Sequence, residues 1–378
     1  MKIIQLITRV DKGGSSENVI DLSTALFKKG FDVVLIYGAK QRLVFPFVSY
    51  YIKTFERDIN PIKDFLSFLK ILLILIKEKP DIVHTHTSKA GFIGRWACWL
   101  YRMVFKRNLK IIHTPHGHIF YGYFGRFKSY LFVLIERVTS IITDVLVALT
   151  ENERKESLEY GVGKQDKWVV IPSGIDYRFE IKEKDLRRKL NIEDNKIIVG
   201  SVMRLEDIKG DIYFVLAAGQ VLKKYSDIFF ILVGDGKNRK KIEDEVKKLG
   251  IEKNFVLVGW QTNVYDWINI MDIYLQPSLN EGLGRTIIIA ELLSKPIIAS
   301  DVCGIRDLVR DGINGFLVKP KDVYAFALAI IKLARDVELR YNMGKESYIM
   351  VNESVDGFKK YSFERCLYLY TKLYKSIL

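Results

Sequence analysis

Apolar and polar positions alternate in a regular order along the first part of the chain. Residues 3–8 form an apolar run that predicts a buried strand, and residues 17–29 have the spacing of a helix that ends at Gly30. The run 31–37 predicts a second strand. Further apolar runs follow at 81–84, 110–113 and 144–149. Strands that alternate with helices predict a parallel sheet with both faces covered.

The pattern changes at a charged segment, residues 180–195, which we interpret as a connection between domains plus a surface helix. Apolar runs then resume at 197–202, 228–233, 255–258, 273–275, 296–300 and 315–318, with helices expected over 211–224 and 237–249. We therefore predict an α/β protein with two doubly wound, Rossmann-like domains that face a central cleft. Ligands of such folds bind at the carboxyl ends of the strands.

Positive charge is concentrated in the first domain. The 378 residues carry a net charge of +14, and residues 40–128 alone hold 16 Lys and Arg against 5 Asp and Glu. These cations are interleaved with aliphatic and aromatic residues around 62–76, 92–103 and 119–130, which favours an anionic membrane surface as partner. For residues 65–76 taken alone, a buried helix whose lysines reach water is the favoured interpretation, and the membrane surface is favoured for the three segments together. No nucleic-acid module is present, so nucleic acid is not an expected partner.

The cysteines and the N-terminus indicate a reducing compartment. Cys98, Cys303 and Cys366 form no Cys-x-x-Cys pair, so neither a disulfide framework nor a structural zinc site is predicted. The N-terminal apolar run is too short for the apolar core of a signal peptide. Apolar runs also fall short of the ~20 residues of a membrane-spanning helix. We expect a cytoplasmic protein.

All the histidines of the chain lie within one window of 35 residues, at positions 84, 86, 113, 116 and 118. They follow two predicted strands, so they could line the ligand-binding edge of the first domain. His-x-His can bind zinc, but no acidic residue or cysteine accompanies either group, and we predict no metal site. A structural role remains open for any one of them, with His113 and His118 favoured.

Glycine turns and cations suit an anionic ligand in both domains. Gly13-Gly14 joins a strand to a helix, and residues 280–286 form a second such turn. Free amides at a helix N-terminus favour phosphate. Arg204 and Lys209 follow a strand end in the second domain, and two cations there could stabilise a departing diphosphate. Ordinary surface charge is the alternative explanation.

Taken together, these motifs resemble the retaining glycosyltransferases of family 4, over essentially the whole chain. The resemblance rests on Gly13-Gly14, 84–91, 113–118, 172–176, Arg204-Leu205, Lys209-Gly210, 234–236, Pro277-Ser278 and 281–284. It implies the GT-B fold, with domains at 1–178 and 179–355 and a C-terminal helix within 356–378 that crosses back to the first domain. It also implies transfer of a sugar from a nucleotide diphosphate sugar, UDP favoured, to an acceptor hydroxyl with retained configuration.

The same resemblance assigns roles to individual residues. It implies catalytic roles for His116, Glu281, Arg204 and Lys209, and no metal or other cofactor. Donor contacts are implied for Gly13, Gly14, Arg204, Lys209, Gly234, Val258, Gly259, Glu281, Gly282, Leu283, Gly284, Arg285 and Thr286. Acceptor contacts are assigned to His84, His86, Lys89 and His118.

The first-domain pattern, with Phe120-Tyr121-Gly122-Tyr123-Phe124, resembles bacterial members that act on polyprenyl-diphosphate-linked saccharides in surface polysaccharide synthesis. This implies a lipid-linked acceptor and peripheral association with the inner face of the plasma membrane. One position departs from the family. A second glutamate that holds the ribose is usual eight positions after the first, and Ile289 stands there. A non-catalytic paralogue that binds a nucleotide sugar or a membrane is therefore the alternative.

Overall fold

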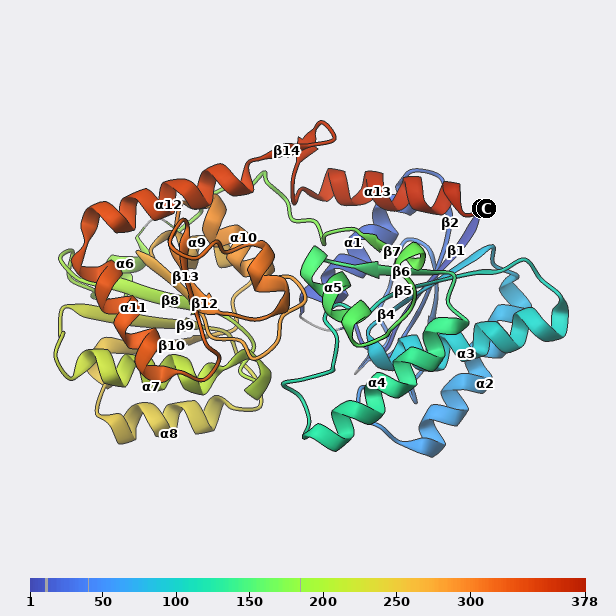
Figure 1. Cartoon of the computed structure of the whole chain (residues 1–378), viewed down its shortest axis with the longest axis horizontal. Coiled ribbons are helices and arrows are strands. Elements are labelled where there is room, and N and C mark those ends of the chain that lie inside the picture. Colours follow the sequence, from blue (N-terminus) through green and yellow to red (C-terminus); the bar gives the residue numbers. More distant parts are fainter. Residues whose placement is uncertain (11–12, 40, 184) are drawn as a thin grey trace. The chain divides into compact units, whose positions relative to one another are not determined.

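The computed structural model describes residues 1–10, 13–39, 41–183 and 185–378 (Figure 1). Within them the chain divides into two compact units. Unit 1 comprises Met1–Gly174 and Phe363–Leu378, and unit 2 comprises Ile175–Ser362. The family resemblance implies the corresponding boundaries after residues 178 and 355. The second boundary lies later because the short hairpin before the last helix still belongs to unit 2.

Unit 1 is built on a parallel sheet, which in the described residues has the strand order β3-β2-β1-β4-β5-β6-β7. Its strands are β1 (Lys2–Ile7), β2 (Asp32–Tyr37), β3 (Val48–Tyr51), β4 (Ile82–His86), β5 (Lys110–Thr114), β6 (Val145–Ala148) and β7 (Trp168–Val170). Its helices are α1 (Gly14–Lys28), α2 (Pro61–Glu78), α3 (Ser88–Phe105), α4 (Arg126–Ile141), α5 (Glu151–Glu159), the 3-10 turn η1 (Gln165–Lys167) and α13 (Phe363–Ser376). The central strands β1 and β4 are buried almost throughout, as expected for a parallel sheet covered on both faces.

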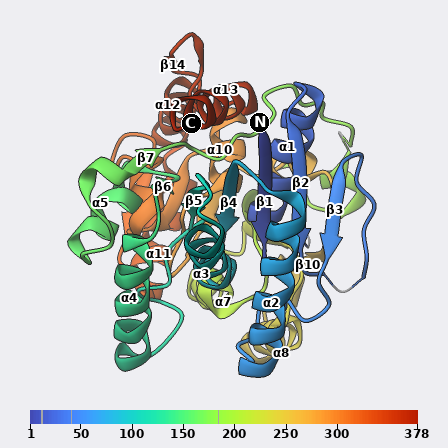
Figure 2. The ribbon, with the colours of Figure 1, turned by 90° about the vertical axis from the view of Figure 1, so that its right-hand side faces the viewer.

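Two sets of helices cover the two faces of this sheet. α1 and α13 pack on one face, where Leu22 and Tyr370 join Ile3 in one apolar cluster. α2 and α3 pack on the other face against Ile4. α4 lies beside α3 on that second face, as Figure 2 shows. The last helix of the chain is therefore an integral part of unit 1.

Unit 2 repeats the architecture with a parallel sheet in the order β10-β9-β8-β11-β12-β13 in the described residues. Its strands are β8 (Ile197–Val202), β9 (Ile228–Val233), β10 (Phe255–Gly259), β11 (Ile273–Gln276), β12 (Ile297–Ser300) and β13 (Gly315–Val318), with the hairpin β14 (Ser354–Val355) and β15 (Phe358–Lys359). Its helices are α6 (Leu186–Lys189), α7 (Asp211–Leu222), α8 (Arg239–Leu249), α9 (Val264–Asn269), α10 (Arg285–Leu292), α11 (Val323–Arg335) and α12 (Val337–Val351), with the turns η2 (Asp207–Lys209), η3 (Glu252–Asn254) and η4 (Cys303–Asp307).

The predicted doubly wound α/β class is confirmed in both units. Among the described helices, none combines the length and the apolar character required to cross a bilayer. Each unit instead buries its apolar residues between a parallel sheet and the helices on its faces. The carboxyl ends of the strands then present loops that carry the candidate site residues of that unit.

Candidate active site

A tight turn after β8 carries Arg204 and Lys209, the two cations of unit 2 that are predicted to bind the donor. Arg204 follows the strand, with its guanidinium 3.7 Å from a carboxylate oxygen of Glu206. Lys209 ends η2, and Gly210 continues the chain with φ +70°. A Cβ at Gly210 would lie 1.9 Å from the carbonyl oxygen of Pro277, so only glycine lets these two segments meet. This close approach brings Lys209 against the segment that follows β11.

A buried polar chain on that second segment ends at Lys209. The hydroxyl of Tyr274 donates to Oε1 of Gln276 (3.1 Å), and the amide of Gln276 donates to Oγ of Ser278 (2.8 Å). Ser278 donates to Oε2 of Glu281 (3.2 Å), whose carboxylate accepts from Nζ of Lys209 at 2.7 and 2.9 Å. Tyr274, Gln276 and Ser278 are at most 2% exposed. Their hydrogen bonds hold Glu281 and Lys209 in one orientation.

The glycine turn after Glu281 leads into α10. Gly284 is the N-cap of this helix and supplies no side chain to cap it, and Leu283 is buried. Arg285 and Thr286 form the first turn of α10. The amide of Gly304 donates to the carbonyl of Glu281, and a Cβ at Gly304 would lie 2.0 Å from the carbonyl oxygen of Gly282. A helix N-terminus built this way favours an anion.

Two further predicted donor residues lie where β9 and β10 end. The amide of Gly234 donates to the carbonyl of Gly259 (2.8 Å), and Val258 precedes that glycine in β10. Gly234 has φ +137°, and a Cβ there would lie 1.8 Å from the carbonyl oxygen of Met203. The loops after β8, β9 and β10 are thereby fixed to one another by backbone contacts.

The position of the missing second glutamate is apolar and buried. Ile289 is 7% exposed in α10. Glu291, two residues further on, is 1% exposed and accepts a hydrogen bond from the amide of Asn314 (3.0 Å). Burial raises the pKa of Glu291 well above its usual range. Its carboxyl group is thus occupied inside unit 2 and does not replace the absent glutamate.

In unit 1, a hydrogen-bonded chain links the histidines of β4 to the last helix. Nδ1 of His84 lies 2.6 Å from the hydroxyl of Tyr374, and its Nε2 lies 2.8 Å from Oγ1 of Thr114. His86 lies 2.7 Å from Oε1 of Gln5 through Nε2 and 3.0 Å from His116 through Nδ1. Both ring nitrogens of His84 and of His86 therefore have partners inside unit 1, and this chain of contacts ends at His116.

The environment keeps these rings uncharged. His84 and His86 are fully buried, and their centroids are 4.0 Å apart. Burial is the largest cause that lowers the pKa of each ring well below its usual range, and the neighbouring histidines lower it further. His116, at the end of the chain, is partly exposed and has φ +56°. A non-glycine residue in this left-handed region is strained, and such strain is common at functional sites.

The remaining predicted residues of unit 1 have intramolecular partners. His118 is 2% exposed, lies 2.8 Å from a carboxylate oxygen of Glu156 and stacks on Phe120. Lys89 pairs with Asp64 at 2.6 Å. Gly13 is the N-cap of α1, and Gly14 is its first residue. Asp11 and Lys12, which begin this loop, lie outside the described residues.

Most residues that hold the site in place are not among the site residues predicted from the sequence. Gln5 and Tyr374 are 369 positions apart and meet at 3.1 Å. Gln276 and Ser278 sit two and four residues beyond Tyr274, and their polar side chains interrupt a buried strand end. Buried polar residues at the end of an apolar strand are the one sequence signal that could have identified the polar chain in advance.

Comparison with known proteins identifies the family. A model described as Glycosyltransferase Family 4 matches residues 12–179, and one described as Glycosyl transferases group 1 matches residues 182–350. The chain is 29% identical over 317 residues to UDP-Gal:alpha-D-GlcNAc-diphosphoundecaprenol alpha-1,3-galactosyltransferase of Escherichia coli, covering 82% of this chain and 80% of that protein. It is 30% identical over 262 residues to an uncharacterized 41.2 kDa protein in the cps region of Klebsiella pneumoniae, covering 68% of this chain and 70% of that protein.

A solved structure of similar fold is Anabaena Alr3699/HepE in complex with UDP-glucose. It superposes on this chain with a TM-score of 0.80 at 20% identity and covers 100% of both chains. Two matching family models and this shared fold agree with the two Rossmann-like units described above. The chain belongs to glycosyltransferase family 4, has the GT-B fold, and is a glycosyltransferase that acts on nucleotide sugars.

Proposed function

We propose that this chain transfers a sugar from a UDP-sugar to a lipid-linked saccharide, with retention, in surface polysaccharide synthesis. The Escherichia coli relative is named for UDP-Gal and for a GlcNAc carried on diphosphoundecaprenol. The Anabaena structure holds UDP-glucose. Both support a uridine donor, and the first supports an acceptor with a lipid diphosphate carrier.

The observation that carries the proposal is the Lys209–Glu281 pair at the end of the buried polar chain. The donor diphosphate would compete with Glu281 for Lys209, and Arg204 would bind its second charge. Glu281, released from part of this pairing, would accept hydrogen bonds from hydroxyls of the donor sugar. The amides of residues 283–286 would add the field of the α10 N-terminus.

The proposed reaction is a front-face substitution. The bond between the anomeric carbon and the diphosphate oxygen breaks, and the acceptor oxygen bonds to the same carbon from the same side. The acceptor proton passes to the departing phosphate oxygen. Arg204 and Lys209 would stabilise the charge that grows on the leaving group, which is the role a divalent metal has in other transferases, so we propose a metal-independent reaction.

Unit 1 would supply the acceptor side of the reaction. We assign His116 to the transferred sugar, because its Nε2 lies 3.0 Å from Nδ1 of the buried His86, which holds the ring in place. We place the protein in the cytoplasm, at the inner face of the plasma membrane. Cys98, Cys303 and Cys366 are buried and form no disulfide, which fits a reducing compartment.

Product analysis tests this function. Purified protein is incubated in EDTA with UDP-glucose, UDP-galactose or UDP-GlcNAc and a short-chain prenyl-diphosphate-linked monosaccharide. Transfer from one UDP-sugar is expected, with the anomeric proton coupling of the product matching that of the donor. A product of inverted configuration, or a reaction that begins only when a divalent metal is added, would contradict the mechanism.

A non-catalytic role is the second candidate, and Ile289 is the observation that favours it. Without a glutamate at this position, the protein lacks one charged hydrogen bond to the ribose. This weakens nucleotide binding by about 1.5–3 kcal/mol at most. That loss alone leaves a nucleotide site in place. Binding of UDP without transfer to any acceptor in the product assay would favour this candidate.

A further inference from the structure

Three neighbouring helices of unit 1 expose large apolar side chains. α2, α3 and α4 form the layer on one face of the sheet, and Figure 2 views this layer from outside. The sequence of residues 65–76 taken alone favours a buried helix. The structure buries only one side of α2, represented by Ser67, Ile71 and Leu75, and leaves an apolar stripe on the other. That stripe consists of Ile62, Phe65, Leu66, Leu69 and Leu73, which are 38–75% exposed.

α4 shows this exposure of apolar residues most clearly, because it buries mainly polar residues and exposes apolar ones. Its buried residues are Ser129, Val133, Thr139 and Ser140, of which only the valine is apolar. Its exposed stripe consists of Phe127, Tyr130, Leu131, Leu134, Val138 and Ile141, which are 44–82% exposed. These positions follow the helical period, so they share one face. A helix that borders water normally has the opposite arrangement.

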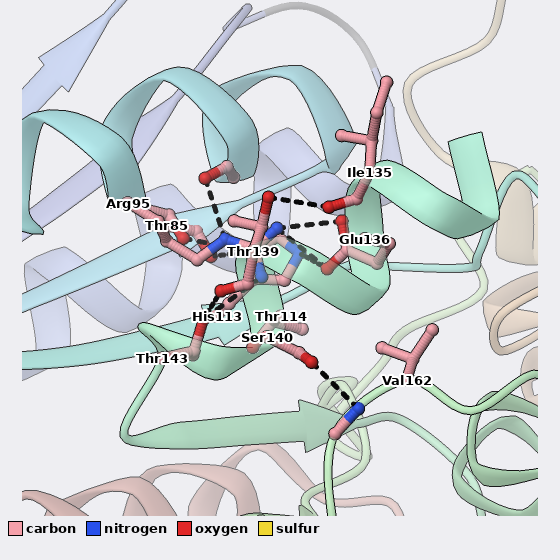
Figure 3. Close-up of polar contacts among 12 residues, drawn as sticks. Thr85, Arg95, His113, Thr114, Ile135, Glu136, Thr139, Ser140, Thr143 and Val162 are labelled. Carbon is pink, nitrogen blue, oxygen red and sulfur yellow. Dashed lines mark hydrogen bonds and ion pairs between the residues drawn. The ribbon is translucent and has the colours of Figure 1, made fainter. Parts of the chain in front are cut away.

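An ion pair with a fully buried arginine fixes α4 in this orientation. Arg95 of α3 is 0% exposed, and its NH2 group lies 2.8 Å from both carboxylate oxygens of Glu136 on α4. Its Nε donates to the carbonyl of Gly91, and its NH1 donates to Thr143 (Figure 3). Rotating α4 to bury its apolar stripe would leave this arginine unpaired inside the protein, which is strongly unfavourable.

The charged residues of the three helices are also divided between two environments: the acidic residues form ion pairs within unit 1, and several cations are exposed. Their acidic residues pair with cations of unit 1: Asp64 with Lys89, Glu78 with Lys2, and Glu136 with Arg95. α3 contains no acidic residue. The exposed cations beside the apolar stripes are Lys70, Lys77, Lys106, Arg107, Arg126 and Lys128. The outer surface therefore combines apolar side chains with positive charge, which matches the headgroup region of an anionic bilayer.

We infer that the exposed faces of α2 and α4, together with the end of α3 at Met103, Val104 and Phe105, insert into the headgroup region of an anionic membrane. The occupant is the lipid surface itself, because charge complementarity and bulky aromatic and aliphatic side chains occur on the same face. The inference deepens the proposed function, on which it rests for the lipid carrier of the acceptor. Membrane binding requires no donor or acceptor and is measured separately.

Flotation with vesicles tests this inference. The full chain is mixed with phosphatidylcholine vesicles that contain either no anionic lipid or phosphatidylglycerol as the anionic lipid. The test variant replaces Phe127, Tyr130 and Ile141 with Ser. The control variant replaces Tyr324, Val337 and Tyr341 of unit 2 with Ser, since these residues are similarly exposed at 66–71%.

The wild type and the control variant are expected to float with anionic vesicles. The test variant is expected to bind at least roughly 100-fold more weakly, because each inserted bulky side chain contributes about tenfold. Raising the salt concentration lowers binding of the wild type. Failure of the wild type to float at low salt, or equal binding by the test variant, would overturn the inference.

Two further measurements distinguish a lipid surface from a second copy of the chain, and membrane binding from catalysis. A concentration-dependent dimer of the wild type that the test variant abolishes would assign this face to a second copy and overturn the lipid inference. Activity on a water-soluble acceptor analogue is expected to be equal in the wild type and the test variant. That equality keeps failure of membrane binding distinct from failure of the proposed function.

Discussion

Two surface helices, α4 in unit 1 and α8 in unit 2, distribute their residues in opposite ways. α8 buries Ile242 and Val246 and covers its outer side with ion pairs such as Lys240–Asp244. α4 buries serine and threonine and exposes its aromatic and aliphatic residues. The difference teaches that amphipathicity alone does not say which side of a helix meets the core. A buried partner, here Arg95, decides it.

The two candidate sites differ in the same physical terms. Unit 2 holds a charged pair, Lys209 and Glu281, at the end of a buried polar chain. Unit 1 holds neutral histidines whose pKa values burial lowers. All the histidines of the protein belong to unit 1. The charged site suits a diphosphate, whereas the neutral rings orient a side chain without adding charge.

Acid should separate the two units most strongly. His84, His86 and His113 have pKa values lowered by burial, so the unfolded state takes up their protons first as the pH falls below about 6.5. Unit 1 is then expected to lose up to about 4 kcal/mol of unfolding free energy per pH unit. The effect of Glu291 on unit 2 has the opposite sign. Because burial raises its pKa in the folded state, its contribution to the unfolding free energy is most favourable at low pH and is lost as the pH rises.

Hydrogen exchange at pH 7.5 and 5.5, corrected for the intrinsic rate, measures this difference. Peptides of unit 1 should lose protection at pH 5.5 before those of unit 2. Simultaneous loss in both units, or earlier loss in unit 2, would break the comparison.

Replacing Lys209 with Ala should depress turnover by roughly 10²–10³-fold, the size seen when one group that stabilises developing negative charge is removed. The matched control is Lys240→Ala, which removes a lysine from an exposed ion pair on α8. Initial rates and melting temperatures are measured together. A normal rate for Lys209→Ala in a folded protein would exclude it from leaving-group stabilisation.

Tyr374→Phe tests the hydrogen-bonded chain that links the histidines of unit 1 to α13. It removes the hydroxyl that contacts His84 and Gln5, and leaving buried polar partners unsatisfied should lower the unfolding free energy by about 1–3 kcal/mol. Tyr130→Phe is the control, because that hydroxyl is on an exposed residue of α4. Urea unfolding provides the values, and equal stability of the two variants would show that the chain does not hold α13 in place.

Ile289→Glu should have the smallest effect. Restoring a carboxylate at this position is expected to tighten UDP binding about tenfold, within the range of one charged hydrogen bond. Glu291→Gln is the control, since its carboxyl group faces Asn314. Titration calorimetry compares the dissociation constants. Unchanged or weaker UDP binding by Ile289→Glu would mean that the ribose is held by other groups.

Buried strands could be predicted from the sequence because strands of a covered parallel sheet are continuous apolar runs, such as Ile197–Val202 and Ile228–Val233. The edge strands β3 and β7 were not expected, since partly exposed strands with polar neighbours lack that signal. α1 begins at Gly14 rather than at residue 17, because the glycine-serine turn already forms its first turn.

The position of the site could be predicted from the sequence, but the hydrogen-bond partners of its residues could not. Arg204 and Lys209 follow a strand end, which is where parallel sheets place ligand sites. The partner of His84 is Tyr374, 290 residues away, and local pattern carries no information on such a contact. The sequence favours a structural role for His118, but only the fold shows which residues enclose its ring, namely Glu156 and Phe120.

Calorimetric titration of the purified protein with UDP, and then with GDP and ADP, in EDTA tests the central claim most directly. Micromolar binding of UDP without metal is expected at one site per chain, and Lys209→Ala is expected to lose most of that affinity. Absence of binding to all of these nucleotides, or UDP binding that Lys209→Ala leaves unchanged, would contradict the donor site assigned to unit 2.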